Sequence, residues 1–351
     1  MRVPFPLRRP WLLLQGARTD RDRPDLDTLQ AIEDPDRFVW AMLPHAARSF
    51  AASILMLPAR QARSAAVAYL YCRMLDTYED LGEPERAPRA LEAFADRMRT
   101  LEAPPPPPTR WATSRDRTHL LLIERCHLVD RVFAGLPAIE RARIVELVEA
   151  MAAGMIASSR QFAAQGGVLI DGDQVSRYCH SVIGEPALYT LLLLGKGRLT
   201  VAQRADALAS SELIQLANIT RDIERDLARG VAYHPSLRPH LGRPDAVEPV
   251  REARRHLMAQ ALPQVSSFVR LAGEMTTGRF SLSRGSAVVM LLHTDRHYRW
   301  CAGKVGLAGW RGPGAGWEIM LGSAAAALSP GWARHLMRRV ERDFLAAAAA
   351  L

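Results

Sequence analysis

The sequence has no long apolar run, few cysteines and almost no lysine. No stretch of the 351 residues approaches the ~18 consecutive apolar residues needed to cross a bilayer. The four cysteines, at positions 72, 126, 179 and 301, share no short spacing and so indicate neither a zinc site nor a disulfide framework. Scattered single cysteines fit a reducing compartment, and we therefore expect a cytoplasmic protein.

The charge is carried almost wholly by arginine. Only Lys196 and Lys304 are lysines, so 44 of the 46 basic residues are arginines, set against 37 acidic residues, and the net charge is +9. Arginine offers phosphates and carboxylates a planar fork of donors. Because the basic residues are scattered among acids and form no nucleic-acid motif, we expect no nucleic-acid partner. A phosphorylated small molecule or an anionic membrane surface fits this charge better.

Helical periodicity covers nearly the whole chain, and no alternating β pattern of useful length occurs. Good helix formers dominate the composition, and apolar residues recur at helical intervals. The pattern predicts helices over residues 37–50, 61–81, 118–133, 138–162, 175–194, 202–229, 249–271 and 281–297, and a final helix reaching the alanine tail. The proline run at 104–108 predicts a stiff connection, and residues 303–316 predict a loop. We expect a single all-α domain.

The first residues form an N-terminal extension, 1–36. Arginines at positions 2, 8 and 9 flank Phe5 and the apolar residues 11–14, which are too few for a signal peptide. Such a segment is either a frayed terminus or a peripheral contact with a membrane surface, which would be the inner one. The domain itself is expected over 37–300, completed by a loop and helix over 301–351.

Two acidic motifs point to metal chemistry. In the first, Asp76 and Asp80 are spaced i, i+4 and share one helix face, where like charges repel unless a cation is present. Ligands that are all oxygen suit Mg²⁺. Arg73 lies one turn before Asp76 and could hold a phosphate.

The second motif repeats this geometry with Asp222 and Asp226. Arg221 immediately precedes the pair, and Asn218 lies one turn earlier. Either pair alone could be solvated surface acids. Two such helices facing each other would place four carboxylates at one cavity mouth, an arrangement that binds a metal–diphosphate group.

A third segment runs from Tyr178 to Pro186, where the proline is expected to kink an apolar helix. Tyr178 could move a proton or stabilise a cation with its ring face, or be a core tyrosine with a satisfied hydroxyl. His180 is open to the same two interpretations.

Four segments together resemble the squalene/phytoene synthase family of head-to-head prenyl transferases. In the family's order they are residues 48–50, 71–80, 178–184 and 218–235. In their amino-acid sequence, the first acidic motif and the Tyr-Cys-His segment resemble squalene synthases. The likeness runs over residues 40–300.

The resemblance implies an isoprenoid-synthase fold, all-α, around a deep apolar cavity. It implies Mg²⁺ as a cofactor and two prenyl diphosphates, expected to be farnesyl diphosphate, as substrates that become presqualene diphosphate and then squalene. NADPH use is left open. By position the resemblance implies that Mg²⁺ is coordinated by Asp76, Asp80, Asp222 and Asp226. It implies that the diphosphate is contacted by Arg48, Ser49, Arg73 and Arg221, with support from Asn218. It also implies that Tyr178 assists proton transfer.

Three departures bear on the second half-reaction and on substrate choice. Arg225 stands where the family has a glutamate, with Glu224 one place earlier, and Val231 stands where the family has an arginine. Ala187 replaces a family glycine after Gly184. A phytoene or dehydrosqualene synthase, an enzyme that stops at presqualene diphosphate and a cyclase of one prenyl diphosphate stay open as alternatives. A non-catalytic binding or assembly module is the alternative from a different class.

Overall fold

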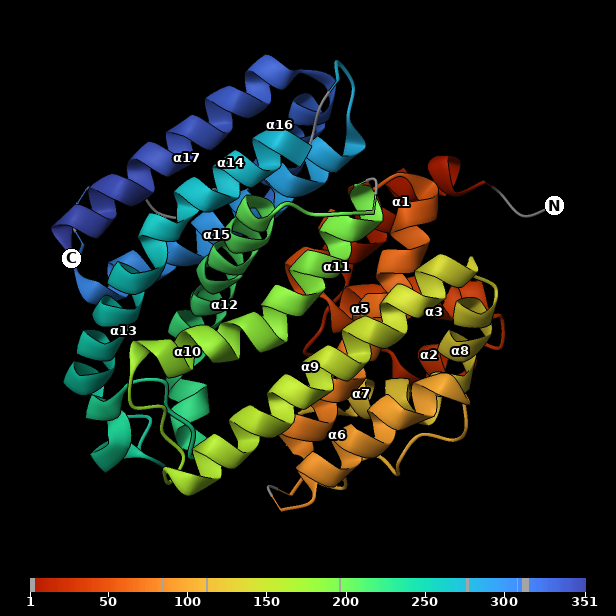
Figure 1. Cartoon of the computed structure of the whole chain (residues 1–351), viewed down its shortest axis with the longest axis horizontal. Helices are drawn as coiled ribbons and strands as arrows, with labels where there is room; N and C mark the ends of the chain where they lie inside the picture. The colour runs from red at the N-terminus through yellow and green to blue at the C-terminus, as the bar shows by residue number, and fades with distance from the viewer. Residues whose placement is uncertain are drawn as a thin grey trace. The chain divides into compact units, whose positions relative to one another are not determined.

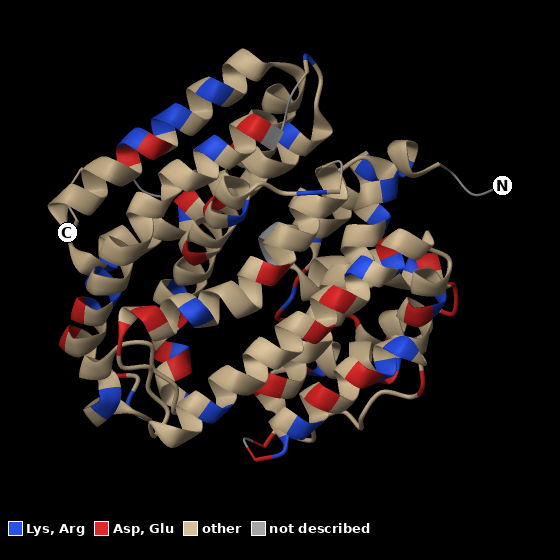
Figure 2. Cartoon of the chain, in the orientation of Figure 1, with Lys and Arg blue, Asp and Glu red and all other residues tan. Residues whose placement is uncertain are grey.

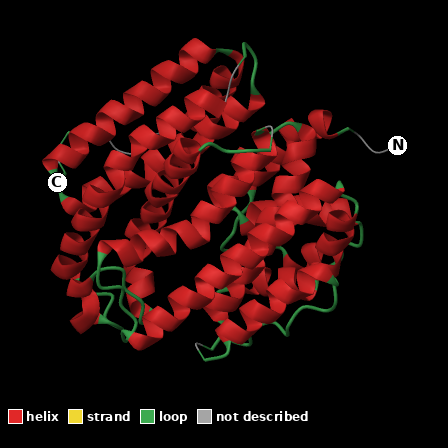
Figure 3. Ribbon diagram, in the orientation of Figure 1, coloured by secondary structure: helices red, strands yellow, loops and turns green. Residues whose placement is uncertain are grey.

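The computed structural model describes residues 4–83, 85–111, 113–195, 197–275, 278–307, 309–310 and 316–351, apart from the side chains of Arg48, Ser49 and Met275. These ranges fold into helices, and within them the only β pairing is one isolated bridge between Val168 and Ala232 (Figure 3). The predicted all-α class is confirmed. The chain forms two compact units, Met1–Ser159 and Arg160–Leu351. In the described ranges no helix is both long and apolar enough to cross a membrane.

The described residues of the first unit form helices joined by loops (Figure 1). Its helices are α1 (Phe5–Arg18), α2 (Leu26–Gln30), α3 (Pro35–Ala46), α4 (Arg48–Met56), α5 (Ala59–Leu81), α6 (Ala87–Asp96), α7 (Ser114–Glu124), α8 (Cys126–Ala134) and most of α9 (Ala138–Ala164). Helix α5 is central, because α3, α4, α6, α7 and α8 all contact it. Small and apolar side chains are buried on most of its sides, as expected for a helix enclosed by others.

A buried polar cluster ties α5 to its neighbours. The Arg97 guanidinium, at the end of α6, donates from Nη2 to Asp130 Oδ2 at 2.6 Å, and the Tyr71 hydroxyl donates to Asp130 Oδ1 at 2.7 Å. The Arg97 side chain is only 3% exposed. Tyr78 donates to the carbonyl of Pro105 and so fastens the proline-rich connection to α5. Each buried charge in this cluster has a partner, as burial demands.

The second unit is built around α12. Its helices are α10 (Gly172–Cys179), α11 (Glu185–Leu194), α12 (Val201–Ala228), α13 (Val247–Ala261), α14 (Val265–Met275), α15 (Leu282–Val305), α16 (Gly316–Leu328) and α17 (Pro330–Ala350). Thr200 and Gln203 form a capping box that starts α12. Buried apolar side chains then recur every three or four residues along the helix, and α10, α11, α13, α14 and α15 pack on it.

Several predicted helices are divided in two. Ala47, whose backbone is extended, separates α3 from α4, and Arg125 separates α7 from α8. A short 3-10 turn that contains Pro263 separates α13 from α14. The loop predicted to start at residue 303 starts later, because α15 continues to Val305 and ends at Gly306, whose φ of 71° suits glycine. Residues 311–315 of that loop lie outside the described ranges. The final segment holds α17 up to Ala350.

Candidate active site

The first acidic motif occupies one face of α5. Arg73 Nη1 lies 3.3 Å from Asp76 Oδ2, and Arg73 Nη2 donates to the Tyr69 hydroxyl at 3.2 Å. The Arg73 and Asp76 side chains are 22% and 27% exposed, and Asp80 is exposed one turn further along. The predicted spacing therefore places an arginine and two carboxylates along one partly open strip of an otherwise buried helix.

The carboxylates of this strip are under electrostatic strain. Burial raises the pKa of Asp76 to about 6, against the lowering effect of Arg73 and with a further increase from Asp80. Burial, Asp80 and Asp76 raise the pKa of Glu79 well above its usual range. A divalent cation would relieve this repulsion. The donors are all oxygen and few, which fits Mg²⁺, because it takes one or two carboxylates and completes its shell with water and substrate phosphate.

The early Arg-Ser element begins α4. Arg48 and Ser49 are its first residues, but their side chains lie outside the described part of the chain. Their contacts with diphosphate stay predictions.

The second acidic motif forms a connected polar row on α12. Arg221 meets Asp222 with two contacts, Nε–Oδ1 at 2.8 Å and Nη2–Oδ2 at 2.5 Å. Arg221 Nη1 donates to Asn218 Oδ1 at 3.1 Å and lies 3.4 Å from His297 Nδ1 on α15. Asn218 in turn donates to Gln215 at 3.2 Å. Asn218, Arg221 and Asp222 are thus brought together as predicted, whereas Gln215 and His297 were not foreseen.

Asp226 continues this motif one turn beyond Asp222 and is half-buried. Each motif therefore supplies two carboxylates with an arginine beside the first of them. In the described ranges no three His, Cys, Asp or Glu side chains gather as a ready metal cluster.

Glu224 does not replace the acid that Arg225 displaces. Its carboxylate accepts from Arg254 Nη2 at 2.7 Å and from Lys304 Nζ at 3.0 Å, on α13 and α15. Glu224 is two residues from Asp222, so its side chain lies on the opposite side of α12 from the Asp222 carboxylate. Arg225 is exposed. The second motif thus has one acid fewer than the family pattern, and Glu224 joins helices instead.

Replacing Glu224 should separate stability from activity. Glu224→Gln is expected to cost about 1–2 kcal/mol of unfolding free energy, because the partly exposed ion pairs with Arg254 and Lys304 weaken. Turnover should stay within a few-fold of the parent, whereas the matched change Asp226→Asn should impair it strongly. Urea unfolding and steady-state kinetics measure the two quantities. Equal losses of Mg²⁺-dependent turnover in both variants would place Glu224 in the site.

Tyr178 belongs to a cluster of three rings. Its ring centroid lies 6.1 Å from that of Phe162, at 82°, and 5.3 Å from that of Tyr233. The Tyr178 and Tyr233 hydroxyls are 3.5 Å apart. The chain reaches Tyr233 through a turn at Gly230, where φ is 80°. Tyr178 is half-buried, so its hydroxyl and ring are held in place by packing. Phe162 and Tyr233 were not singled out from the sequence.

Where the sequence predicted a kink, the chain forms a π-helical turn, His180–Gly184, directly before α11, and Pro186 lies in the first turn of α11. The kink itself stays a prediction. Such π-helical turns insert an extra residue into a helix and often occur at functional sites. A Cβ on Gly184 would lie 3.0 Å from a Leu208 methyl carbon, so glycine permits close packing on α12. His180 Nε2 lies 2.9 Å from Glu212 Oε1 on α12, which fixes the imidazole.

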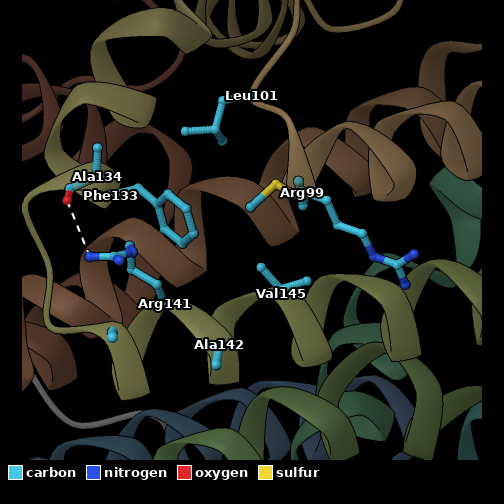
Figure 4. Close-up of a pocket in the computed structure, with 9 residues that line it drawn as sticks. Arg99, Leu101, Phe133, Ala134, Arg141, Ala142 and Val145 are labelled. Carbon is cyan, nitrogen blue, oxygen red and sulfur yellow. Dashed lines mark hydrogen bonds between the residues drawn. The ribbon is translucent and has the colours of Figure 1, made fainter.

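A separate pocket lies in the first unit (Figure 4). Its volume is about 440 Å³, and its lining includes Arg99, Phe133 and Arg141 but none of the predicted site residues. Arg99 pairs with Glu149 at 2.6 Å, and Arg141 donates to the Leu136 carbonyl at 2.6 Å. Both guanidinium groups are already engaged, and we assign no ligand to this pocket.

The model of the squalene/phytoene synthase family matches residues 43–278, which include both acidic motifs and the Tyr178 segment. The chain belongs to the squalene/phytoene synthase family. The resemblance read from the sequence is thereby confirmed. Members of this family are prenyltransferases that join isoprenoid units head to head, and the chain is an enzyme of this class.

Solved structures of similar fold are squalene synthases. A structure described as the complex of TcSQS with the ligand BPH1237 is 18% identical, with a TM-score of 0.65, covering 91% of this chain and 99% of that one. A second, the complex of TcSQS with E5700, is also 18% identical, with a TM-score of 0.63 and coverage of 90% and 98%. At this identity the likeness shows the shared fold. No curated protein matches the chain.

Proposed function

We propose that this squalene/phytoene synthase family member condenses two farnesyl diphosphates in a Mg²⁺-dependent reaction that gives presqualene diphosphate and then squalene. The observation that carries the proposal is the repeated pairing of an arginine with the first carboxylate of an i, i+4 aspartate pair. It occurs as Arg73–Asp76 on α5 and as Arg221–Asp222 on α12. Part of the proposal is that both motifs act on one pair of substrates.

The side chains of each motif have distinct tasks. When bound, Mg²⁺ would supply positive charge to the departing diphosphate. Asp76 and Asp80, and separately Asp222 and Asp226, would hold it through carboxylate oxygens. Arg221 is held by both oxygens of Asp222. Once Mg²⁺ is bound to the Asp222 carboxylate, the Arg221 guanidinium group would be able to donate to a diphosphate instead.

The proposed carbon chemistry needs one proton to leave. Loss of diphosphate from the first farnesyl group leaves an allylic cation, and the double bond of the second substrate forms the new carbon–carbon bond. Proton loss then closes the cyclopropane of presqualene diphosphate. Tyr178 is proposed to relay this proton to the departed diphosphate, which is the base that the reaction itself releases. The Tyr233 hydroxyl donates to the Tyr178 hydroxyl at 3.5 Å and so helps to position it. The cluster of Phe162, Tyr178 and Tyr233 rings would stabilise nearby positive charge.

A specific observation favours presqualene diphosphate as an alternative end product. Val231, at the place of a family arginine, packs against the apolar core of the second unit. Arg225 is exposed. The second motif therefore has less positive charge to stabilise the second diphosphate as it leaves. That departure must precede the formation of squalene. Use of NADPH as hydride donor belongs to this later step.

Tyr178→Phe should slow product formation by about 10²–10⁴-fold, the usual contribution of one proton-transferring side chain. The ring packing with Phe162 is kept, so unfolding should be unchanged. Tyr233→Phe is the matched control and should lose less than tenfold, because Tyr233 acts only through Tyr178. Single-turnover kinetics with farnesyl diphosphate measures both. Parent-like rates for Tyr178→Phe would remove the proposed proton transfer.

The product assay tests the proposed reaction. Purified protein receives farnesyl diphosphate with Mg²⁺ or with excess chelator, with and without NADPH, and extracts are analysed by mass spectrometry. Squalene that needs NADPH supports the full proposal, and presqualene diphosphate in both tubes supports the shorter reaction. A C15 product would indicate a cyclase of one substrate. No Mg²⁺-dependent turnover of farnesyl or geranylgeranyl diphosphate would contradict the proposal and favour a binding module.

We also propose a cytoplasmic protein with peripheral contact at the inner membrane surface. Helix α1 exposes Leu7, Trp11 and Leu14, at 72%, 60% and 47%, and their i, i+4, i+7 spacing puts them on one face. Arg8 and Arg18 lie on the same helix. An apolar face with arginines suits a helix lying in a membrane interface.

A further inference from the structure

Helix α16 is apolar on all sides, yet one side of it faces solvent. Glu318 is its single charged residue. Trp317, Leu321 and Leu328 are 64%, 62% and 66% exposed, and their spacing of four and seven residues keeps them on one face. The opposite face, with Ile319 and Ala326, is buried against α15 and α17. The solvent-facing side of a surface helix ordinarily carries polar residues. An exposed apolar face of this kind indicates a surface that binds a partner.

Two exposed aromatic residues lie near the end of α16. Ser281 N donates to the Ala327 carbonyl at 2.9 Å, which brings the preceding Phe280, 61% exposed, to the end of α16. Trp332, at the start of α17, is 45% exposed and stacks on His335. We name the resulting set the α16 surface: it consists of Phe280, Trp317, Leu321, Leu328 and Trp332.

Arginines adjoin the α16 surface. Helix α17 packs on α16, and its exposed side carries Arg334, Arg338, Arg339 and Arg342. Basic positions recur along α17 in Figure 2. Helix α17 also carries two acids, Glu341 and Asp343. Asp343 pairs with Arg299 at 2.9 Å and lies 3.8 Å from Arg342, so the arginines still outnumber the acids on this helix. Apolar side chains, tryptophans and arginines in one region are the composition that binds anionic bilayers, with rings at the headgroup level and guanidinium groups on lipid phosphates.

We propose that the α16 surface docks the protein on an anionic lipid bilayer, with α16 lying in the plane of the interface. Its 13 residues are too short to cross a bilayer, which fits a helix that lies on the surface. A second copy of the chain is a poorer occupant, because a two-fold contact would bring the arginines of two α17 helices towards each other. The proposal adds a second contact to the membrane contact proposed for α1, and it does not depend on the reaction catalysed.

Vesicle flotation tests the docking. The full chain is mixed with vesicles of phosphatidylcholine alone or of phosphatidylcholine and phosphatidylglycerol, at low and high salt. We expect binding to the anionic vesicles that weakens with salt. Leu321→Gln combined with Leu328→Gln should weaken it by at least about tenfold, because the apolar area that enters the bilayer is lost. Arg338→Gln combined with Arg342→Gln should reduce binding to anionic vesicles only.

Matched controls keep the result specific to this surface. Val201→Gln changes an exposed apolar residue, 89% exposed, at the start of α12 and should bind like the parent. Unchanged thermal midpoints show that the variants fold. The proposal is overturned if the parent binds no vesicles, if Leu321→Gln/Leu328→Gln binds as well as the parent, or if only Leu7→Gln on α1 abolishes binding. A lipid-free dimer dissociated by Leu321→Gln/Leu328→Gln would assign the surface to a second copy and also overturn it.

Discussion

Asp76→Asn should lower kcat/KM for farnesyl diphosphate on the order of 10³-fold and raise the Mg²⁺ concentration needed for half-maximal rate. The size follows from losing one preorganised electrostatic contact to a leaving group whose charge grows in the transition state. The substitution keeps the shape of the side chain, and it removes a carboxylate whose pKa is already raised to about 6 by burial. Unfolding free energy should therefore not fall. Initial rates over a range of Mg²⁺ concentrations measure the effect.

The control for this variant is Asp96→Asn. Asp96 ends α6 in the same unit and is exposed. Its variant should retain parent kinetics and the parent requirement for Mg²⁺. If Asp76→Asn also keeps the parent kinetics and the parent requirement for Mg²⁺, the acidic residues of α5 do not form a metal site.

Asp130→Ala should destabilise the protein by about 3–5 kcal/mol, the cost of leaving a buried charge without its partner. Arg97, 3% exposed, would lose its contact at 2.6 Å, and the Tyr71 hydroxyl would lose its acceptor. The effect should be largest on the unfolding of the first unit, because the cluster joins α5, α8 and the end of α6. Urea unfolding followed by circular dichroism measures it.

A double variant separates the lost partner from lost packing. Arg97→Met with Asp130→Leu removes both charges and should recover much of the loss, because a well-packed apolar pair often equals a buried ion pair in stability. If Asp130→Ala costs no more than Asp96→Ala, the buried cluster contributes little to stability.

The long helices were predictable because their apolar period is uninterrupted. Residues 61–81, 138–162 and 202–229 were expected to be helical, and α5, α9 and α12 begin and end within two residues of those limits. The breaks at Ala47 and Arg125 were missed, because neither residue type marks a helix end by itself. They depend on how the flanking helices pack.

The site was predictable only where its partners share a helix. The i, i+3 and i, i+4 rules place Arg73 with Asp76 and Asn218 with Asp222 from sequence alone. Partners that come from other elements escaped prediction: His297 beside Arg221, Tyr233 beside Tyr178, and Arg254 beside Glu224. Sequence spacing within one motif carries no information on these contacts, which arise from tertiary packing.

The most direct test of the proposed reaction is an isotope-mixing experiment. The protein receives equal amounts of unlabelled and fully deuterated farnesyl diphosphate with Mg²⁺, and the masses of the products are recorded. Joining two substrates head to head predicts C30 products in three mass groups: both units unlabelled, both deuterated, and mixed. The mixed group is the most abundant and is split by one mass unit, because the proton lost comes from either substrate. Asp76→Asn should form the mixed group on the order of 10³-fold more slowly. Products of two masses only, each with one farnesyl unit, would contradict the account.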